Sequence, residues 1–479
     1  MYRFNFETSG KTRNEHDLLG DKEVPIEALF GVQTLRCCEN FNISVNHLCD
    51  YPEFIKALGM VKMAAIKANY DLGLVSKEIR DSIVAACEEL IEYKHVEQFP
   101  IDMIQGGAGT SVNMNANEVI ANRALEIMGK ERGQYEFCHP NDHVNMAQST
   151  NDAYPCAMHL GIYFYHEIIT KNLQILIDSF AKKQEEFKDV VKMGRTQLQD
   201  AVPMTMGQTF GAFKDAMKHE FQRLNYAAQG LLSTNMGATA IGTGITAEPG
   251  YAEKCTDYLK EISGLPVFLE EDLVEATHDT SSMVIYSGVL KHCAIRLSKI
   301  CNDLRMLSSG PRCGLNEINL PARQPGSSIM PGKVNPVIPE VVNQICFKVI
   351  GNDMAVCMAS EAAQLELNVM EPVLVESVVE SADWLGTSFR TLAEFCINGI
   401  TANKEHCKQV VKNSIGIVTA LKPYIGYAAC TKIAKEAQQT GKGVYELVLE
   451  QKILSEKNLH KILDPANMVK PTIVELDED

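Results

Sequence analysis

The sequence has no run of eighteen uncharged apolar residues, so no membrane-spanning helix is expected. It also has no excess of basic residues: 45 Lys and Arg stand against 61 Asp and Glu, which gives a formal net charge of −16 and a pI of about 5.3. Nucleic acids and anionic membrane surfaces are bound by basic faces, so the charge balance argues against both classes of partner. An anionic substrate would need a local basic pocket.

Disulfide and zinc patterns are missing as well. The fifteen cysteines are scattered through apolar helical stretches, as with Cys293 and Cys301, whereas disulfide frameworks are typical of short secreted chains. Cys37 and Cys38 are adjacent, but no second pair at metal spacing accompanies them. Residues 1–23 contain acids and no apolar core, so no secretory signal is expected. We therefore expect reduced, buried thiols, no metal site and a cytoplasmic location.

Strand signals are few, and amphipathic helical patterns dominate the chain. Two heptad seams of apolar residues predict long helices that pack on other helices. The first seam is Tyr286, Leu290, Cys293, Leu297, Ile300, Leu304 and Leu307, and the second is Phe54, Leu58, Val61, Ala65, Ala68 and Leu72. Further long helices are expected at about 157–183, 207–232 and 337–363. The prediction is an all-α fold with an elongated central bundle of long helices.

Polar, glycine-rich segments separate these helices. They are QGGAGTSVNMNANE, HPNDHVNMAQSTND, KMGRTQLQDAVPM, NMGATAIGTGITAEPG and GSSIMPGKVNP, the last at 326–336. The density of Gly and Pro in 326–336 excludes a helix and predicts a shaped loop. Neutral donors in quantity, with one lysine, suit a small dicarboxylate, but Ser, Thr and Asn also cap helices, as Ser149 or Asn151 would do. Composition alone leaves a binding site and simple capping equally open.

Two other sites are disfavoured by what their motifs lack. GATAIGTG, at 237–244, is similar to a phosphate-binding loop, but the required lysine and the preceding strand are absent. His139, Asp142 and His143 have the right chemistry for a metal, but their spacing fits no standard ligand set. We expect structural or surface roles for these histidines.

The loop GSSIMPGKVNP closely resembles the signature of the aspartase/fumarase superfamily, and the other polar segments resemble its members in the same order along nearly the whole chain. The resemblance implies lyases built from long helices, with four identical subunits that form a multi-helix bundle and active sites shared by three subunits. We expect an N-terminal lyase domain at 1–149, the central long-helix domain at 150–404 and a small C-terminal helical domain at 405–479.

The resemblance also implies a set of functional residues. Ser327 corresponds to the base that removes the proton next to a carboxylate, and Gly332 and Lys333 are expected to help stabilise its oxyanion. The loop around it is expected to close over the substrate as a mobile lid. The implied substrate contacts are Thr110, Ser149 and Thr150 at the reacting carboxylate, Thr196, Lys333 and Asn335 at the other carboxylate, Asn151 at the leaving group, and Ser328 as a further hydrogen-bonding group.

Position 197 separates two reactions within this superfamily. Fumarases carry histidine there as part of a proton relay, and Glu340 matches the acid that supports it. Hydroxide leaves only if a proton is delivered to it, whereas Gln197 can bind an ammonium but cannot shuttle a proton. STND and NPVIPE also resemble ammonia-lyases. The expected reaction is the reversible anti elimination of ammonia from L-aspartate to give fumarate, through an aci-carboxylate intermediate, with class II fumarate hydratase as the alternative.

Two further classes of protein are disfavoured. A catalytically silent crystallin-like homologue would be expected to lose Ser327 or Lys333, and an amino-acid-binding protein would usually have two α/β lobes. No organic cofactor is expected. The resemblance leaves open whether a divalent cation such as Mg²⁺, or aspartate itself, activates the enzyme at a second site. It also leaves open how the base and leaving group are reprotonated with Gln197 in place of histidine.

Overall fold

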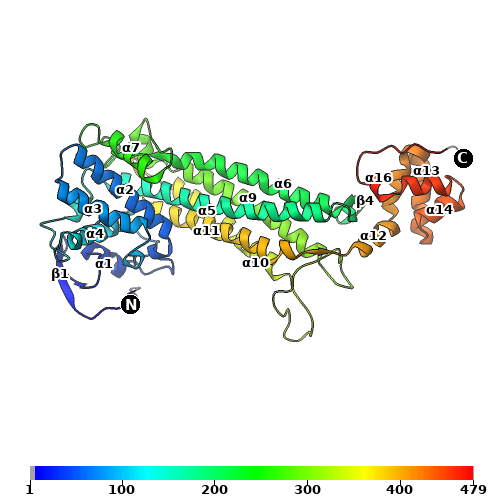
Figure 1. Cartoon of the computed structure of the whole chain (residues 1–479), viewed down its shortest axis with the longest axis horizontal. Helices are drawn as coiled ribbons and strands as arrows, with labels where there is room; N and C mark the ends of the chain where they lie inside the picture. The colour runs from blue at the N-terminus through cyan, green and yellow to red at the C-terminus, as the bar shows by residue number, and fades with distance from the viewer. Residues whose placement is uncertain (1–5, 478–479) are drawn as a thin grey trace. The chain divides into compact units, whose positions relative to one another are not determined.

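The computed structural model describes residues 6–477 and is predominantly helical, which confirms the predicted all-α class (Figure 1). The longest helices are α2 (Pro52–Asp71), α5 (Thr150–Glu186), α6 (Met206–Ala227), α9 (Ser281–Leu307), α10 (Val337–Glu361) and α11 (Glu371–Phe395). The helices α1 (Val32–Asn40), α3 (Lys77–Ile91), α4 (Thr110–Ile127), α7 (Tyr251–Ser263) and α8 (Leu273–His278) are shorter. The last helices are α12 (Lys404–Asn413), α13 (Lys422–Thr440), α14 (Val444–Glu450), α15 (Glu456–Ile462) and α16 (Pro465–Met468).

The strands form only two-stranded sheets within residues 6–477. The antiparallel pairs are β1 (Thr12–Asp17) with β2 (Gly20–Pro25), β3 (Val191–Thr196) with β4 (Gln199–Thr205), and β7 (Ile318–Asn319) with β8 (Thr401–Ala402). The parallel pair is β5 (Ser233–Thr234) with β6 (Phe268–Leu269). The segment KMGRTQLQDAVPM, expected to be a connector, is instead the β3–β4 hairpin.

The chain divides into two compact units. Unit 1 contains the described residues up to Lys171, together with Gln222–Ala294 and Phe347–Gly386. Unit 2 contains Asn172–Phe221, Ile295–Cys346 and the described residues from Thr387 onward. The predicted boundary after 149 coincides with the start of α5 and that after 404 falls one residue inside α12, but the three-domain division stays a prediction.

In unit 1, the predicted seams are buried. Phe54, Leu58 and Val61 of α2 have no exposed surface, and Tyr286 and Leu290 of α9 are equally enclosed, so the heptad prediction is confirmed here. Side-chain hydrogen bonds link four helices in turn: His166 of α5 to Tyr286 of α9, Ser287 of α9 to Asp353 of α10, and Asn352 of α10 to Glu380 of α11. α11 was not predicted, although Pro372 near its start is a helix N-terminal signal.

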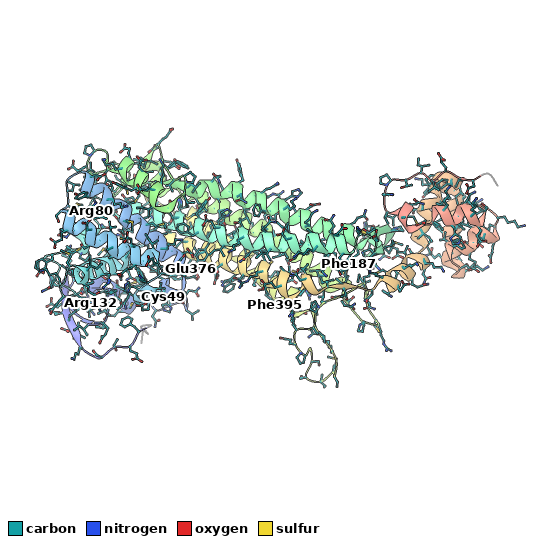
Figure 2. The ribbon with its side chains drawn as sticks, in the orientation of Figure 1. Cys49, Arg80, Arg132, Phe187, Glu376 and Phe395 are labelled. Atoms are coloured by element: carbon teal, nitrogen blue, oxygen red, sulfur yellow. The ribbon has the colours of Figure 1, made fainter. Side chains whose placement is uncertain are left out.

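Aromatic packing organises unit 2. Phe187, labelled in Figure 2, lies just beyond the end of α5 and packs against Phe210 of α6, with ring centroids 5.4 Å apart. Phe180 and Phe213 join the same cluster. The C-terminal helices have their own buried core, which includes Leu421, Ile433, Leu447, Val448 and Leu459. The predicted helical character of this region is confirmed.

The cysteines are thiols, and most are buried. All fifteen lie within the described residues and none is paired there, in agreement with the prediction, although Cys313 and Cys357 are exposed. Burial raises the pKa of thiols such as Cys38 to about 12, which keeps them protonated and unreactive. Among residues 6–477, no helix is long and apolar enough to span a membrane.

A bidentate ion pair between α3 and α4 makes the stability of unit 1 depend on pH. Arg123 donates to both carboxylate oxygens of Glu89 at 2.6 and 2.8 Å, and His95 lies 2.7 Å away. The guanidinium lowers the pKa of Glu89 from 4.5 to about 2. A carboxylate whose pKa is lowered in the folded state stabilises the protein above its unfolded pKa, and this stabilisation is lost as the pH falls towards the folded value.

We therefore expect Glu89→Gln to lower the free energy of unfolding by about 1–2 kcal/mol at pH 7, a value reduced for partial solvent screening. The difference from the unsubstituted protein should shrink as the pH falls below 4.5, because Glu89 is then protonated in the unfolded chain. Urea unfolding at pH 7 and pH 4 measures both quantities. A constant difference across this range would contradict the assignment.

Candidate active site

Thr110 is the first residue of α4, and a glycine turn holds it there. The preceding Gly109 has φ +82°, and a Cβ at this position would lie 2.3 Å from the ring of Tyr154 on α5. Only glycine allows the two helices to approach so closely. Thr110 is exposed at this N-terminus, where the unpaired backbone N–H groups of a helix attract anions.

Of the two N-cap candidates, Ser149 and Asn151, the structure places Ser149 as the cap of α5. Its Oγ accepts the backbone N–H of Asn151 at 3.3 Å, and Asp152 Oδ1 accepts the backbone N–H of Ser149 at 2.9 Å. These two hydrogen bonds satisfy backbone N–H groups at the start of α5. Thr150 Oγ1 accepts an N–H from Asn113 of α4 at 3.3 Å. The N-terminal turns of α4 and α5 are thus joined, and Thr110, Ser149, Thr150 and Asn151 lie in one region of unit 1.

Asp152 connects this region to the loop at 237–244, whose sequence is similar to a phosphate-binding loop. Its Oδ2 accepts the backbone N–H groups of Gly237 and Thr239 at 3.2 and 2.9 Å. Asp152 is fully buried, which raises its pKa to about 6. Asn151 Nδ2 donates to the carbonyl oxygen of Ala240 at 2.7 Å. The glycine loop therefore binds a carboxylate of the protein itself.

The histidines of HPNDHVN have structural roles, as predicted. They belong to a π-helical turn at Pro140–Val144. His139 Nδ1 accepts the backbone N–H groups of Asn141 and Asp142 at 3.1 and 3.2 Å, and His143 Nδ1 accepts that of His139 at 2.8 Å. No group of three or more possible metal-binding side chains occurs within the described part of the chain.

Gln197 lies at the tip of the β3–β4 hairpin in unit 2. Gln197 and Leu198 form its two-residue turn with φ values of +53° and +63°, the conformation of a tight hairpin turn. Residues other than Gly, Asn and Asp rarely adopt this conformation, and such strain tends to occur at functional positions. Thr196 and Gln197 are both exposed. The turn therefore leaves both side chains open to solvent.

Glu317 anchors this hairpin and was missed by the sequence analysis. It is fully buried, and its carboxylate accepts from Arg195 Nη1 at 2.5 Å and lies 3.1 Å from Lys192 Nζ. Arg195 immediately precedes Thr196, so the ion pairs fix the base of the turn. The signal available in the sequence was an acidic residue, Glu317, directly before the apolar Ile318.

The loop at 326–336 holds Ser327 in a tight turn. Its two ends are closed by the Gly326 N–H, which donates to the Lys333 carbonyl at 2.7 Å, and by Asn335 Nδ2, which donates to the Gly326 carbonyl at 2.8 Å. Ser327 Oγ accepts the backbone N–H groups of Ile329 and Met330 at 3.2 and 2.9 Å. These two donors would stabilise an oxyanion on Ser327.

The sequence analysis did not name the two donors that the structure places at Ser327 Oγ, the backbone N–H groups of Ile329 and Met330. The contribution expected of Gly332 and Lys333 stays a prediction. Ser328 and Lys333 are exposed, and the Lys333 backbone is used to close the loop. Asn335 uses one amide N–H on the loop, which leaves its second N–H as a donor for a ligand.

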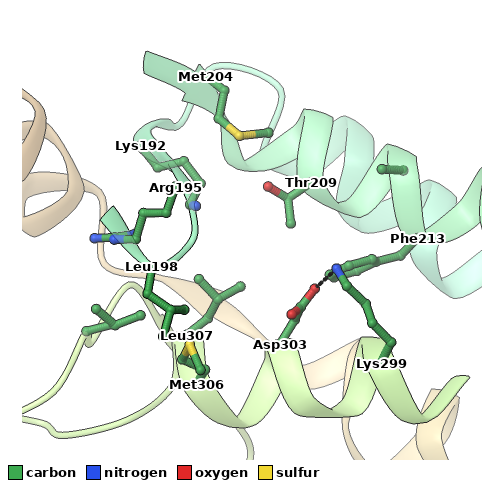
Figure 3. Close-up of a pocket in the computed structure, with 12 residues that line it drawn as sticks. Lys192, Arg195, Leu198, Met204, Thr209, Phe213, Lys299, Asp303, Met306 and Leu307 are labelled. Carbon is green, nitrogen blue, oxygen red and sulfur yellow. Dashed lines mark hydrogen bonds and ion pairs between the residues drawn. The ribbon is translucent and has the colours of Figure 1, made fainter. Parts of the chain in front are cut away.

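A separate cavity of about 310 Å³ lies beside the hairpin (Figure 3). Its lining includes Leu198, Phe213 and Met306, and on one wall Lys299 pairs with Asp303 one turn along α9. None of the twelve lining residues belongs to the predicted substrate set. The cations that line it are paired with carboxylates: Lys299 with Asp303, and Lys192 and Arg195 with Glu317.

The predicted residues form two groups. Thr110, Ser149, Thr150 and Asn151 lie in unit 1, at helix N-termini that favour a carboxylate. The second group lies in unit 2 and consists of Thr196, Gln197, Ser327, Ser328, Lys333 and Asn335. The first group has the chemistry of an anion-binding site, and the second contains a serine whose Oγ accepts two backbone N–H groups, together with an exposed lysine.

Comparison with known proteins agrees with this chemistry. The family described as "Lyase" matches residues 20–351, and "Fumarase C C-terminus" matches residues 417–470. Aspartate ammonia-lyase of Pseudomonas aeruginosa is 55% identical over 97% of this chain and 98% of its own. A solved structure titled fumarate lyase:delta crystallin, from Brucella melitensis and bound to cobalt, is 51% identical, with a TM-score of 0.93 over 96% of this chain and 100% of its own.

A recombinant class II fumarase from Schistosoma mansoni shares the fold at lower identity. Its TM-score is 0.90 and its identity 33%, over 95% of this chain and 99% of its own. Both the family match, which covers more than half of the chain, and the full-length relatives lead to one assignment. The chain belongs to the lyase family, within the aspartase/fumarase superfamily.

Proposed function

We propose that this chain catalyses the reversible deamination of L-aspartate to fumarate and ammonia. The observation that carries the proposal is the identity of 55% with an aspartate ammonia-lyase across nearly the whole length of both chains. Identity with the class II fumarase is 33% over a similar length. The chemistry at position 197 supports the same choice, because a glutamine amide can accept from an ammonium but cannot deliver a proton to hydroxide.

The proposed reaction begins when Ser327 removes the proton from the carbon next to a carboxylate of the substrate. The Ile329 and Met330 N–H groups hold Ser327 Oγ at 3.2 and 2.9 Å and would lower the cost of its oxyanion. Loss of the proton next to the carboxylate places a second negative charge on that group. Thr110, Ser149 and Thr150, at the N-termini of α4 and α5, would stabilise this aci-carboxylate. No organic cofactor takes part in these steps.

The rest of the substrate is assigned to the second group and to Asn151. Lys333, with Thr196 and Asn335, would bind the distant carboxylate, and Ser328 would add a hydrogen bond. Asn151 donates its amide N–H to Ala240, so its Oδ1 is the atom directed at an ammonium. Gln197 would contact the same leaving group. Ammonia then departs on the face opposite to the removed proton, which is the anti course of the elimination.

The test is the ultraviolet absorbance of fumarate, measured with purified full-length protein supplied with L-aspartate and, separately, with L-malate. We expect fumarate from aspartate only. Turnover of malate in place of aspartate would instead establish the hydratase. Parallel assays with EDTA and with added Mg²⁺ test the proposal that no cofactor is required, and they show whether a divalent cation activates the enzyme.

We also propose that the active site is completed in a homotetramer. The two residue groups lie in different units of the chain, as sites shared among three subunits would require. In unit 1, α10 carries Phe347, Met354 and Met358 at 61, 64 and 60% exposure, and their spacing of seven and four residues puts them on one face. An exposed apolar face on a helix already buried on the other side is typical of a protein interface.

Phe347→Glu is expected to convert the assembly into smaller species and to reduce aspartate turnover at least about tenfold, because a buried, unpaired carboxylate would oppose association. Size-exclusion chromatography with light scattering gives the mass directly. Tyr427→Glu, which introduces the same charge at an exposed aromatic residue of α13, is the matched control and should leave the mass unchanged. Four-subunit mass for Phe347→Glu would exclude this face from the interface.

A cytoplasmic location is proposed from the thiols. Cys313 and Cys357 are exposed thiols, and a reducing compartment preserves such groups. Fractionation of cells that produce the protein, followed by immunodetection, would test this location.

A further inference from the structure

Lys62 is a charged residue in the most enclosed part of α2. It lies in the apolar sequence GMVKMAAI, and the whole residue has 0% exposure. Its Nζ donates to Asn113 Oδ1 at 2.6 Å, Gln148 Oε1 at 2.8 Å and Asn145 Oδ1 at 3.0 Å. An ammonium has three N–H donors, so this geometry uses every one of them.

Burial of the Lys62 ammonium does not stabilise the fold. All three acceptors are neutral amide oxygens, so no ion pair in this shell offsets the desolvated charge. Burial lowers the pKa of Lys62 to about 7, although the carboxylate of Asp152 raises it in part. Apolar residues commonly replace buried charges without loss of stability. The lysine therefore requires a different explanation.

Its acceptors all belong to the segments that carry the substrate donors. Gln148 directly precedes Ser149 and Thr150, and Asn145 lies in the same loop. Asn113 lies on α4, three residues after Thr110. Lys62 thus links the first turn of α4 to the loop that leads into α5. The Lys62 side chain therefore fixes the start of α4, with Thr110, relative to the start of α5, with Ser149, Thr150 and Asn151.

The lysine also fixes the orientation of one amide. Because Lys62 can only donate as an ammonium, Asn113 presents its oxygen to that form, and the NH₂ group faces the other way. Asn113 Nδ2 accordingly donates to Asn145 Oδ1 at 3.1 Å and to Thr150 Oγ1 at 3.3 Å. Since Thr150 Oγ1 accepts this N–H, its own hydrogen is directed elsewhere. The hydroxyl becomes a donor that is available to a carboxylate.

We propose that Lys62 is a positioning residue: acting through Asn113, it sets the Thr150 hydroxyl as a hydrogen-bond donor to the reacting carboxylate. The inference rests on the proposed function for the identity of the substrate. Without the ammonium, the Asn113 amide can turn over and present its oxygen to Thr150. Thr150 would then donate its hydroxyl hydrogen to Asn113 and could no longer donate it to the substrate.

The first test is Lys62→Met, with Lys67→Met on the same helix as the matched control. We expect kcat/KM for aspartate to fall about 100-fold in Lys62→Met, the effect of losing one preorganised donor, and to change less than about threefold in the control. Thr150→Val should cost a similar factor alone but add less than about fivefold to Lys62→Met, because both changes remove the same donor. Fully multiplicative losses would overturn the proposal.

The second test separates positioning from folding. Asn113→Asp gives Lys62 a charged partner but replaces the N–H donors with acceptors, so the Thr150 hydroxyl is reversed. We expect this variant to keep or raise its melting temperature while kcat/KM falls about 100-fold. An active Asn113→Asp enzyme would contradict the mechanism, even if Lys62→Met failed to fold.

A binding measurement distinguishes failure of this inference from failure of the proposed function. Succinate is a dicarboxylate without a leaving group, so calorimetric titration tests the donors without turnover. We expect Lys62→Met to bind succinate at least about tenfold more weakly than the unsubstituted protein. If the unsubstituted protein does not release fumarate from aspartate, the proposed function is wrong. If it does, and Lys62→Met matches it in both rate and binding, the inference is wrong.

Discussion

Alanine in place of Ser327 is expected to lower kcat for the deamination of L-aspartate by about 10³-fold, because the reaction then has no base at the acidic carbon. The Ile329 and Met330 N–H groups that hold Ser327 Oγ would remain, but with no oxyanion to stabilise. The fumarate absorbance assay measures this loss directly. Binding of succinate should change little, since a base that removes a proton is not required to hold the ground state.

Ser328→Ala is the matched control for this experiment. It makes the same chemical change at the adjacent residue of the same loop, and only a supporting hydrogen bond is assigned to Ser328. We expect a loss of about tenfold or less. Equal losses in the two variants would mean that the loop conformation, not the Ser327 hydroxyl, had been disturbed. A loss of activity in Ser328→Ala alone would mean that Ser328, not Ser327, is the base.

The conformation of the Ser327 loop could be predicted from its sequence because glycine and proline determine it locally. Gly326, Pro331, Gly332 and Pro336 exclude regular structure whatever surrounds them. The heptad seam of α9 was predictable for a similar reason, since a period of three and four residues is typical of a helix packed on others. The N-cap at Ser149 is also local chemistry, and the structure confirms it.

The β3–β4 hairpin could not be predicted by the same means. Its turn residues, Gln197 and Leu198, adopt left-handed φ values that are normally signalled by Asn or Gly. The turn is imposed by the surrounding structure, including the ion pairs from Arg195 and Lys192 to the buried Glu317. Contacts between residues more than a hundred positions apart leave no periodic signal in the sequence.

Lys62 and Asp152 show a second limit. A lysine within an apolar helix usually extends its head to solvent, and an aspartate near a helix start usually only caps it. Their further roles depend on which loops surround them: the amides of Asn113, Asn145 and Gln148 for Lys62, and the backbone of Gly237 and Thr239 for Asp152. Sequence patterns identify local structure, whereas a buried polar network depends on the whole fold.

The second large effect is expected at Lys333, whose side chain is the cation assigned to the distant carboxylate. The chain carries a formal charge of −16, so a dianionic product such as fumarate is repelled unless a local cation compensates. Lys333→Ala should lower kcat/KM for aspartate by about 10²–10³-fold. The loss should appear mainly in KM, because this carboxylate is bound in the ground state and in the transition state alike.

Two variants make this prediction specific. Lys333→Arg keeps the charge but replaces a compact ammonium with a planar guanidinium, so we expect it to recover only part of the loss, about tenfold relative to Lys333→Ala. Lys432→Ala removes an exposed lysine of α13 and changes the net charge equally, so its kinetics should match those of the unsubstituted protein. If Lys333→Ala and Lys432→Ala behaved alike, Lys333 would contribute only to the overall field. A selective loss at Lys333, with succinate binding weakened in parallel, would instead locate the distant carboxylate at the closing end of the Ser327 loop, where the Lys333 carbonyl already pairs with Gly326.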